Sequence, residues 1–398
     1  MGKMTVEDLS IKDRTILMRV DFNVPIENGK VANDKRIRAA MPTIRYILEK
    51  GGRLVLMSHL GRPKGKRVPG MSLKPCAAAL GHLIHRDVRF IDDCIGEAVE
   101  KAVSKLLPGQ VLLLENLRFY REETENDAAF ARKLAGLADL YVNDAFGTAH
   151  RAHASTSGVT RYMKKSAAGF LIMKELKYLG GALKSPESPF VAILGGAKIS
   201  GKIDVIANLL SKVDRLLIGG GMAFTFFKAK GFGIGNSLLE KDKVELARTL
   251  LEKGGDKILL PIDCMISDAF DFQSRSVGTM KAVSSDTIPD GWIGLDIGPK
   301  SIDRFGAVIR SAKTVVWNGP MGVFELEETA KGTFKIAHII ASATEKGAVT
   351  IIGGGDSAAA AEKAGVAHQI SHISTGGGAS LEFLEGKTLP GVAVLTEK

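Results

Sequence analysis

Short apolar runs that alternate with longer amphipathic segments limit what this chain can fold into more than any other feature of its sequence. Each run has the length of one strand, and polar residues and then a helical pattern follow it. Such runs are typical of parallel strands whose two faces are both covered by crossover helices. The expected strands are residues 15–20, 53–57, 111–114, 140–142, 190–194, 215–218, 314–317, 349–352 and 370–374, with helices such as 34–50 and 125–138 between them.

The alternation runs through both halves of the chain, so we expect an α/β protein of two doubly wound, Rossmann-like parallel-sheet domains joined by a bridging helix. An amphipathic stretch between residues 166 and 188 runs into the turn-forming sequence SPESP and marks the boundary. The tail's short apolar run can pack back on a domain, with the N-terminal domain as the candidate. The expected divisions are an N-terminal domain (1–168), an interdomain helix and linker (169–188), a C-terminal domain (189–380) and a tail (381–398).

Composition excludes several classes of protein. With 398 residues, 45% hydrophobic and 25% charged, the chain has the balance of a globular protein rather than a disordered one. Cys76, Cys94 and Cys264 stand far apart, which argues against a disulfide framework and a structural zinc site. No apolar run approaches the ~18 residues of a membrane span, and the N-terminus lacks the apolar core of a signal peptide. We therefore expect a cytoplasmic protein without a membrane partner.

The net charge of +10 limits the classes of ligand that the protein can bind, but says little about its fold. Lys and Arg form no run of five or six, and aromatic residues make up only 6% of the chain, so an extended nucleic-acid surface is poorly supported. Arginines scattered close to glycines fit small anions better. The sequence therefore predicts small anionic ligands and no nucleic-acid partner.

In the first half of the chain, the residues that follow the strands are strongly polar. Ligands of open parallel sheets bind beyond the carboxyl ends of the strands, where gathered guanidinium groups could grip a phosphate and a carboxylate. One such arginine alone is usually a solvated surface charge, but four strand ends share the pattern. The residues are Arg19, Asp21, Asn23, Ser58, His59, Arg62, Glu115, Asn116, Arg118, Asn143, Asp144, His150, Arg151 and His153, with Arg36 at the start of a helix.

Two histidine pairs, His82/His85 and His150/His153, raise the question of a metal site. Neither pair comes with the carboxylate arrangement of the zinc-binding His-Glu-x-x-His motif. Packing or contact with an anion is therefore the expected role of these histidines.

In the second half, the strand ends carry glycines instead. Glycine lets backbone amides approach a phosphate, and the N-terminus of the helix that follows favours an anion. Some such turns only allow a helix to pack closely on a strand, but four in one domain predict a nucleotide site. The clusters are GGAK (195–198), GGGM (219–222), GGGDS (353–357) and TGGGA (375–379).

Near matches to known motifs refine the prediction of a nucleotide site. The segment GAKISGK (196–202) satisfies most of a P-loop pattern, but Ile203 stands where the magnesium-binding hydroxyl belongs. No G-x-G-x-x-G fingerprint follows a strand, so a nicotinamide-dependent dehydrogenase is the weaker alternative. Asp356 can hold magnesium or cap a helix, and Glu325 can reach a ribose hydroxyl or cap a helix.

Several of these segments together closely resemble the phosphoglycerate kinase family. They are RVDFNVP (19–25), SHLGRP (58–63), ENLRF (115–119), GTAHRAH (147–153), GGAK, GGGMAFTF, WNGPMGVFE, GGGD and STGGGASLE, in order along nearly the whole chain. The resemblance implies a glycolytic phosphotransferase with a carboxyl group as acceptor. It would transfer a phosphoryl group reversibly between ATP and the carboxylate of 3-phosphoglycerate, giving ADP and 1,3-bisphosphoglycerate, with Mg²⁺ as cofactor.

The resemblance also implies a role for each matching residue. The phosphoglycerate would contact Asp21, Asn23, Arg36, His59, Arg62, Arg118 and Arg151. The nucleotide would contact Gly195, Gly196, Lys198, Lys202, Gly219, Gly294, Asn318, Glu325, Gly353, Gly354, Gly355, Asp356 and Ser357. The catalytic residues would be Arg36, Lys198, Gly355 and Gly378, and Asp356 would hold the metal ion. The family commonly has an Asp just before the second lysine of its lysine loop, and this chain departs from it with Gly201.

The chemistry explains why no general base stands out. The accepting carboxylate is already ionised at neutral pH, so the enzyme has to position anions and offset their repulsion. Arg36 in one half and Lys198 in the other suit that task. Because the Arg-rich and Gly-rich strand ends lie in different domains, we expect hinge closure around the bridging helix, in a monomer. A basic nucleic-acid or structural binder and a nicotinamide-dependent dehydrogenase are the remaining alternatives.

Overall fold

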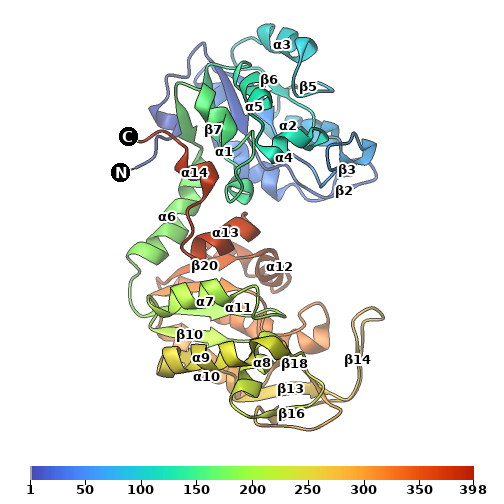
Figure 1. Cartoon of the computed structure of the whole chain (residues 1–398), viewed down its shortest axis with the longest axis vertical. Helices are drawn as coiled ribbons and strands as arrows, with labels where there is room; N and C mark the ends of the chain where they lie inside the picture. Colours follow the sequence, from blue (N-terminus) through green and yellow to red (C-terminus); the bar gives the residue numbers. More distant parts are fainter. Residues whose placement is uncertain (1) are drawn as a thin grey trace. The chain divides into compact units, whose positions relative to one another are not determined.

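The structure is a computed structural model that describes residues 2–398 and divides into two compact units. Unit 1 comprises the chain up to Lys177 together with Thr388–Lys398, and unit 2 comprises Tyr178–Lys387. Each unit is built around a six-stranded parallel sheet. Figure 1 shows helices packed around the strands of each unit. The predicted fold class, two Rossmann-like α/β domains, is confirmed.

The sheet of unit 1 has the strand order β5–β6–β4–β1–β7–β8, and every pairing in it is parallel. The carboxyl ends of its strands therefore meet at one edge. Its strands are β1 (Thr15–Arg19), β4 (Arg53–Met57), β5 (Val88–Phe90), β6 (Val111–Leu113), β7 (Leu140–Asn143) and β8 (Ser166–Ala168), and β2 (Ile26–Glu27) pairs with β3 (Lys30–Val31) as a small hairpin.

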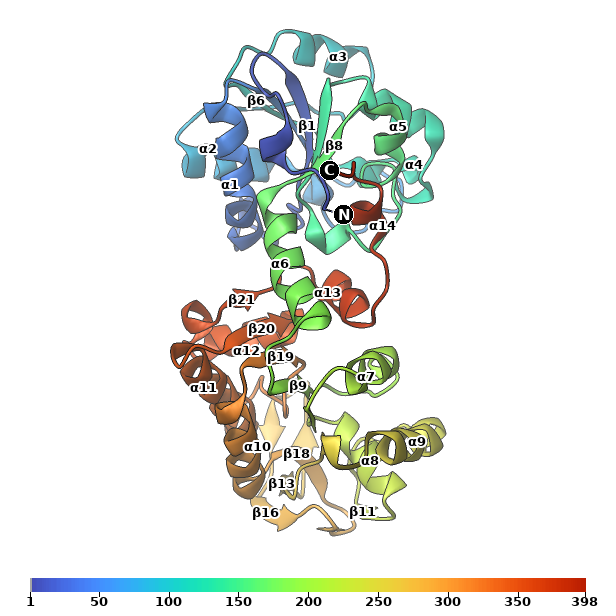
Figure 2. The same cartoon turned by 90° about the vertical axis from the view of Figure 1, so that its left-hand side faces the viewer.

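Helices cover both faces of this sheet because alternate strand residues point to opposite sides. Ile16 and Met18 of β1 belong to a core that includes residues of α1 and α2, whereas the buried Leu17 between them faces the other layer. Figure 2 shows α1 and α2 on one side of the sheet and α5 on the other. The helices are α1 (Lys35–Glu49), α2 (Lys74–Ile84), α3 (Glu97–Ser104), α4 (Arg121–Glu125), α5 (Ala128–Ala135) and α14 (Pro390–Ala393), and α6 (Phe170–Lys184) continues from unit 1 into unit 2.

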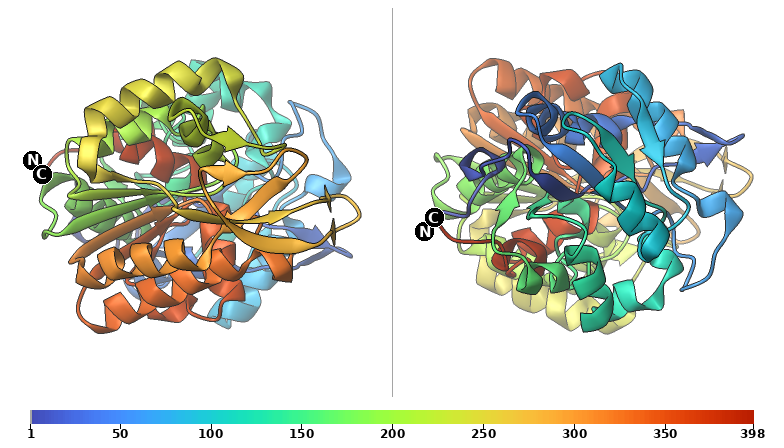
Figure 3. Two further views of the ribbon diagram at one scale, coloured as in Figure 1. Left: turned by 90° about the horizontal axis from the view of Figure 1, so that it is seen from below. Right: turned by 90° about the horizontal axis from the view of Figure 1, so that it is seen from above.

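The sheet of unit 2 has the order β12–β10–β9–β19–β20–β21 and is parallel as well. Its strands are β9 (Phe190–Leu194), β10 (Arg215–Ile218), β12 (Ile258–Leu259), β19 (Thr314–Asn318), β20 (Val349–Gly353) and β21 (His372–Ile373). Ile193 and the fully buried Trp317 pack with α10 and α11 on one face, and Figure 3 shows the yellow α9 on the opposite side of the sheet. The helices are α7 (Ile203–Leu210), α8 (Met222–Ala229), α9 (Val244–Gly254), α10 (Pro299–Ser311), α11 (Lys331–Glu345), α12 (Gly355–Lys363) and α13 (Gly377–Leu384).

Unit 2 also contains short antiparallel pairings that the sequence pattern did not predict. β16 (Met280–Ser284), β13 (Asp263–Ser267) and β18 (Ile293–Ile297) form a three-stranded sheet. β16 exposes three of its five residues, Lys281, Ala282 and Ser284, and Met280 and Val283 are half-buried, so the strand has no continuous apolar run. β14 (Phe270–Asp271) also pairs antiparallel with β15 (Ser276–Val277), whereas β11 (Gly233–Ile234) and β17 (Thr287–Ile288) form a short parallel pair.

The bounds of some helices and strands differ from those expected, because local backbone conformation and capping determine where these elements begin and end. The helix expected over 125–138 is two helices, because Asn126 adopts a left-handed conformation (φ 55°) that ends α4. Asp127 then caps α5, its Oδ1 accepting a hydrogen bond of 2.7 Å from the Phe130 amide. The strand expected over 370–374 is reduced to β21, and β5, β8 and β12 are additional short strands.

The bounds of the compact units also differ from the expected divisions. Helix α13 runs past residue 380, and Asn208 Nδ2 donates a 2.7 Å hydrogen bond to the carbonyl of Leu384. These contacts keep residues 381–387 in unit 2. The chain from Thr388 onward belongs to unit 1, where Asn143 Nδ2 donates a 2.8 Å hydrogen bond to the Gly391 carbonyl.

Candidate functional site

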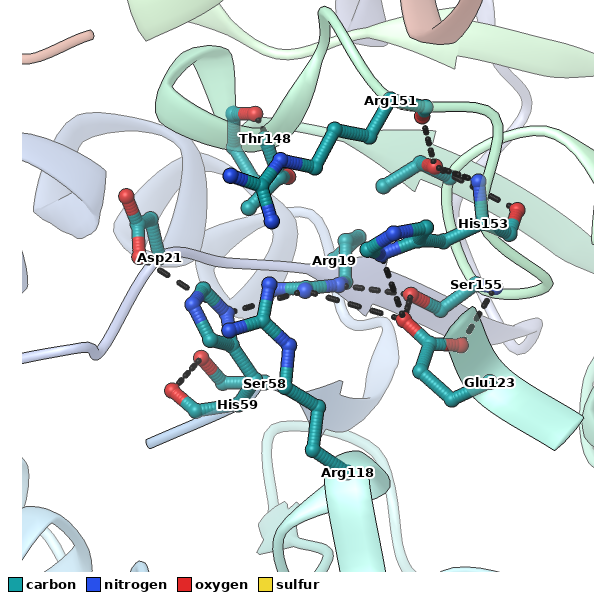
Figure 4. Close-up of polar contacts among 12 residues, drawn as sticks. Arg19, Asp21, Ser58, His59, Arg118, Glu123, Thr148, Arg151, His153 and Ser155 are labelled. Atoms are coloured by element: carbon teal, nitrogen blue, oxygen red, sulfur yellow. Dashed lines mark hydrogen bonds and ion pairs between the residues drawn. The ribbon is translucent and has the colours of Figure 1, made fainter. Parts of the chain in front are cut away.

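The carboxyl edge of the unit 1 sheet gathers basic side chains from separate strand ends. In Figure 4, the side chains of Arg118 and Arg151 extend toward one another from opposite sides, and His59 and Arg19 lie beside the guanidinium group of Arg118. They come together because β4, β6 and β7 all end at this edge of the sheet. The sequence predicted that these residues lie close together, because parallel strands end at the same edge of a sheet.

Hydrogen bonds from neighbouring groups orient the predicted ligand-binding side chains. Arg36 Nη1 lies 2.9 Å from Asp21 Oδ2, and the arginine side chain remains 36% exposed. Asn23 Oδ1 accepts a 2.9 Å hydrogen bond from the Gly61 amide, while Arg118 Nη1 donates one of the same length to the Gly61 carbonyl. The loop at Gly61 is therefore held from two sides. Arg62, the next residue along, is exposed.

A buried network lies beneath these arginines, and only its Arg19 was among the residues predicted from the sequence. Arg19, Glu123 and Ser155 are completely buried, and the Ser155 hydroxyl lies between the two charged groups. Arg19 stands at a strand end and so carried a signal. Glu123 lies in the helix α4 of a highly charged segment and Ser155 in a loop, so no pattern distinguished them.

The electrostatics of the cluster are set by burial among like charges. Burial and the nearby guanidinium groups of Arg19 and Arg118 hold the pKa of His59 well below its ordinary value. Burial and the same two arginines lower the pKa of His153 to about 3. Burial, Arg19 and Arg151 lower the pKa of Arg118 to about 10. Both histidines are therefore neutral at pH 7, and the arginines carry the positive charge of this site.

The histidine pairs do not build a metal centre in the described chain. Among residues 2–398, no group of three or more His, Cys, Asp or Glu side chains could hold a metal ion. His153 lies within the arginine cluster, with its Nδ1 3.8 Å from Glu123 Oε1. His82 and His85 are exposed near the end of α2. Cys76, Cys94 and Cys264 are buried free thiols.

In unit 2, the glycine-rich strand ends surround a cavity of about 410 Å³. Both lysines of the segment 196–202 reach it, Lys198 from an exposed position and Lys202 from a half-buried one. The first residues of α12 and α13 also line it, so amide groups at two helix N-termini face one space. The predicted residues in its wall are Gly195, Gly196, Lys198, Lys202, Asn318, Gly354, Gly355, Asp356, Ser357 and Gly378.

Lys202 is held in this wall by a contact with Asn318, and two glycines pack closely against that asparagine. Its Nζ donates a hydrogen bond to Asn318 Oδ1. A Cβ atom at Gly353 or at Gly354, which has φ +88°, would lie 3.2 Å from Asn318 Nδ2 and press on that contact. Burial lowers the pKa of Lys202 to about 8, against the opposing charge of Asp356 and Glu385.

A second cavity of about 510 Å³ adjoins the first and shares Gly196, Ala197, Pro320 and Asp356 with it. Its wall is largely apolar, and Phe224, Leu238 and Met321 are lining residues that the sequence analysis did not single out. Phe224 lies in the segment GGGMAFTF and Met321 in WNGPMGVFE, so both motifs carried a signal, whereas Leu238 lies in a loop that carried none. The predicted residues in this wall are Gly196, Gly294, Glu325 and Asp356.

Two predicted glycines serve the packing behind these cavities. Gly219 and Gly353 are absent from the walls that the described residues form around either cavity. A Cβ atom at Gly219 would lie 2.5 Å from the sulfur of Met321, which lines the larger cavity. Ser357 Oγ accepts a 2.5 Å hydrogen bond from the amide of Gly319, which has φ +98°, and so holds the turn after β19.

Comparison with known proteins identifies the family. The sequence profile described as phosphoglycerate kinase matches residues 6–387, nearly the whole chain. The chain belongs to the phosphoglycerate kinase family. It is 59% identical to the phosphoglycerate kinase of Prosthecochloris aestuarii over the full length of both chains. It is 56% identical to the cytosolic phosphoglycerate kinase of Triticum aestivum, with 99% of this chain and 98% of the relative covered.

Solved structures of phosphoglycerate kinases have the same fold. That of Coxiella burnetii phosphoglycerate kinase has a TM-score of 0.89 at 40% identity and covers 99% of this chain and 98% of its own. The phosphoglycerate kinase of Pyrococcus horikoshii has a TM-score of 0.84 at 33% identity, with 98% of each chain covered. The resemblance seen in the motifs is thereby confirmed. The chain is a phosphotransferase of the kinase class, and its glycolytic role follows from the family.

The relatives include cytosolic and chloroplastic phosphoglycerate kinases. No helix within residues 2–398 combines the length and the apolar character that a membrane crossing requires.

Proposed function

We propose that unit 1 binds 3-phosphoglycerate, that unit 2 binds ATP or ADP, and that the chain transfers a phosphoryl group reversibly between them. The products of the forward transfer are ADP and 1,3-bisphosphoglycerate. The observation that carries the proposal is the contrast between the two sheet edges. Guanidinium groups gather at the edge of the unit 1 sheet, and glycine amides with two lysines surround a cavity at the edge of the other.

The arginine cluster suits a small molecule with a phosphate at one end and a carboxylate at the other. Arg118 and Arg151 can each offer two parallel N–H donors to such groups. Asp21 orients Arg36 without covering it, because the Arg36 side chain stays 36% exposed. We assign the binding of 3-phosphoglycerate to Asp21, Asn23, Arg36, His59, Arg62, Arg118 and Arg151.

The two adjoining cavities of unit 2 suit the two ends of a nucleotide. The apolar wall that includes Phe224 and Leu238 fits a base, and Glu325 at the same cavity can accept hydrogen bonds from ribose hydroxyls. The smaller cavity offers Lys198, Lys202 and helix N-terminal amides to the phosphates. We assign nucleotide binding to the glycine-rich strand ends together with Asn318, Glu325, Asp356 and Ser357.

The transfer itself calls for charge neutralisation rather than proton removal. The accepting carboxylate is ionised at neutral pH, so no residue has to act as a general base. The developing charge on the transferring group has to be stabilised by fixed cations and amide dipoles. Arg36, Lys198 and the amides of Gly355 and Gly378, in the first turns of α12 and α13, are the groups we assign to that role.

Asp356 fits a magnesium ion shared with the nucleotide phosphates. Its carboxylate is exposed, lines both cavities and follows the glycine turn at the start of α12. Magnesium is commonly bound by one or two protein carboxylates and completed by substrate phosphates, so a single carboxylate at this place is a sufficient protein contribution. When bound, the ion would neutralise part of the charge on the phosphates.

Because the two substrates are assigned to different units, transfer requires the units to approach each other around the helix α6 that joins them. Small-angle scattering should then give a smaller radius of gyration with both substrates than with either one alone. An unchanged scattering profile in the presence of both substrates contradicts the closure.

We further propose a monomeric, cytoplasmic enzyme that binds neither nucleic acid nor membranes. The positive charge is scattered rather than collected into basic runs, which supports small-molecule ligands. Light scattering of the eluted protein should give the mass of one chain.

A coupled assay of ATP consumption tests the proposal most directly. Consumption should depend on added 3-phosphoglycerate and should be lost in Arg118→Met, while exchange of the exposed Arg121 for Met should leave it unchanged. Consumption of ATP that ignores 3-phosphoglycerate would refute the assignment. Salt-sensitive retention on nucleic acid or a nicotinamide-dependent absorbance change in its place would support the alternative classes.

A further inference from the structure

Beneath the arginines of unit 1, two opposite charges are buried side by side. Arg19 and Glu123 are both 0% exposed, and Arg19 Nη2 lies 4.0 Å from Glu123 Oε1. The Ser155 hydroxyl bridges the pair: it accepts a 2.8 Å hydrogen bond from Arg19 Nε and donates one of 2.6 Å to Glu123 Oε1, as Figure 4 shows. The strand end of β1 and the helix α4 are thus joined through this serine.

Each of the three nitrogen atoms of the Arg19 guanidinium group has a partner in the protein interior. Besides Ser155, it donates to the carbonyl of Val20 through Nη1, and its Nη2 lies 3.2 Å from His59 Nδ1. A side chain held in this way and fully buried cannot reach a ligand. Its charge acts on the anion site only through space.

Glu123 holds the loop that follows β7 and opposes the charge of Arg19. Its Oε2 accepts a 2.9 Å hydrogen bond from the Ser155 amide, and its carbonyl accepts one of the same length from Ala154. The fields of both charges reach Arg118: the charge of Arg19 lowers the pKa of Arg118, and that of Glu123 raises it. Arg118 is one of the residues that face the proposed substrate.

We propose that Glu123 is a positioning residue that limits the strength of the anion site by retaining Arg19 in the interior and cancelling its charge. A bound anion then interacts with the accessible arginines, whereas the positive charge of Arg19 is neutralised by Glu123 and adds little to binding. This matters for turnover because an anion held too strongly leaves slowly. The inference rests on the proposed binding of 3-phosphoglycerate to unit 1.

Removing the charge of Glu123 and that of Arg19 in separate variants tests the proposal, because the two changes should shift the Kd for an anion in opposite directions. Glu123→Gln keeps the shape of the side chain but removes the charge. Its oxygen can still accept the hydrogen bond from the Ser155 amide, and its NH2 group can donate to the Ser155 hydroxyl, which reverses the direction of that hydrogen bond. The Kd for 3-phosphoglycerate and for inorganic sulfate should fall about fivefold, as for a unit charge ~10 Å away in a medium between protein and water. Arg19→Gln should raise both Kd values by about the same factor. The double variant should bind within about twofold of the wild type, because the two changes cancel.

Isothermal titration without nucleotide, at constant ionic strength, measures these constants. Glu122→Gln is the matched control: it removes the same charge from the neighbouring, exposed position of α4 and should leave both Kd values unchanged, because solvent screens it. The KM for ATP should stay within about twofold in every variant, because the nucleotide is assigned to unit 2.

Weaker binding in Glu123→Gln, in protein that melts cooperatively, would overturn the proposal, since a purely structural pair weakens binding whichever partner is changed. If a single variant fails to fold because it leaves one buried charge unpaired, the double variant decides: binding more than about fivefold weaker than wild type also overturns it. A wild-type protein that binds sulfate but not 3-phosphoglycerate contradicts the proposed substrate instead, and the sulfate titration still tests Glu123.

Discussion

The binding of ADP should weaken as the pH rises from 7 to 9, because a lysine in the phosphate cavity loses its proton in that range. Burial lowers the pKa of Lys202 to about 8, from an ordinary value of 10.5. About 90% of these side chains are charged at pH 7 and about 10% at pH 9. The phosphates of ADP are already ionised throughout, because their last pKa lies near 6.

The size of the effect follows from these fractions. If the charged lysine is the form that binds the phosphates, the Kd for ADP should rise about tenfold between pH 7 and pH 9, most steeply above pH 8. Isothermal titration at pH 7, 8 and 9 and constant ionic strength measures the change. Lys202→Met should bind ADP more weakly at pH 7 and without this pH dependence. Lys202→Arg stays charged and should also bind with little pH dependence.

The stability of the ligand-free protein should move in the opposite direction. The pKa of Lys202 is lower in the folded state than in the unfolded state, so the unfolded chain binds more protons between pH 8 and pH 10.5. This residue's contribution to the free energy of unfolding therefore increases as the pH rises through that window.

Equal pH slopes of ADP binding in the wild type and in Lys202→Met would refute the reasoning and assign the titration to another group.

Two further substitutions test the assigned roles of the two units one at a time. Arg36→Ala should lower kcat by about 10³-fold, as for other arginines that neutralise a transferring phosphoryl group, with little change in Tm because the side chain is 36% exposed; near-normal turnover in the coupled assay would exclude Arg36 from the transfer. Gly294→Val should raise the KM for ATP about tenfold, because a Cβ atom there overlaps the ring of Phe224 in the larger cavity. The Kd for 3-phosphoglycerate should stay the same in that variant, and a parallel loss of both affinities would indicate general unfolding instead.

Much of the fold could be predicted because buried parallel strands have a direct signature in the sequence. β1, β4, β9 and β10 lie where continuous apolar runs placed them. The strand-end rule then located the arginines and the glycines, since parallel strands bring residues far apart in the chain to one edge. The three-stranded sheet around β13 was not predicted, because its edge strand β16 exposes three of its five residues and has no continuous apolar run.

The parts of the site that escaped prediction depend on contacts between distant residues. Leu238 lines the larger cavity from a loop, and Glu123 meets Arg19 from a short helix. Neither position differs in local sequence from its exposed neighbours. Glu122 and Glu123 are adjacent and chemically identical, yet the first is exposed and the second completely buried.

The amino-acid sequence by itself determined the strand positions, the segregation of arginines and glycines between the two halves, and membership of the family. These features are local or repeat along the chain, and residue types encode them directly. Only the tertiary structure decided which charges are paired in the interior, how Lys202 is seated against Asn318, and which glycines line a cavity rather than pack behind it. The physical reason is that burial and electrostatic pairing depend on the three-dimensional surroundings of a side chain, which residues remote in the sequence supply.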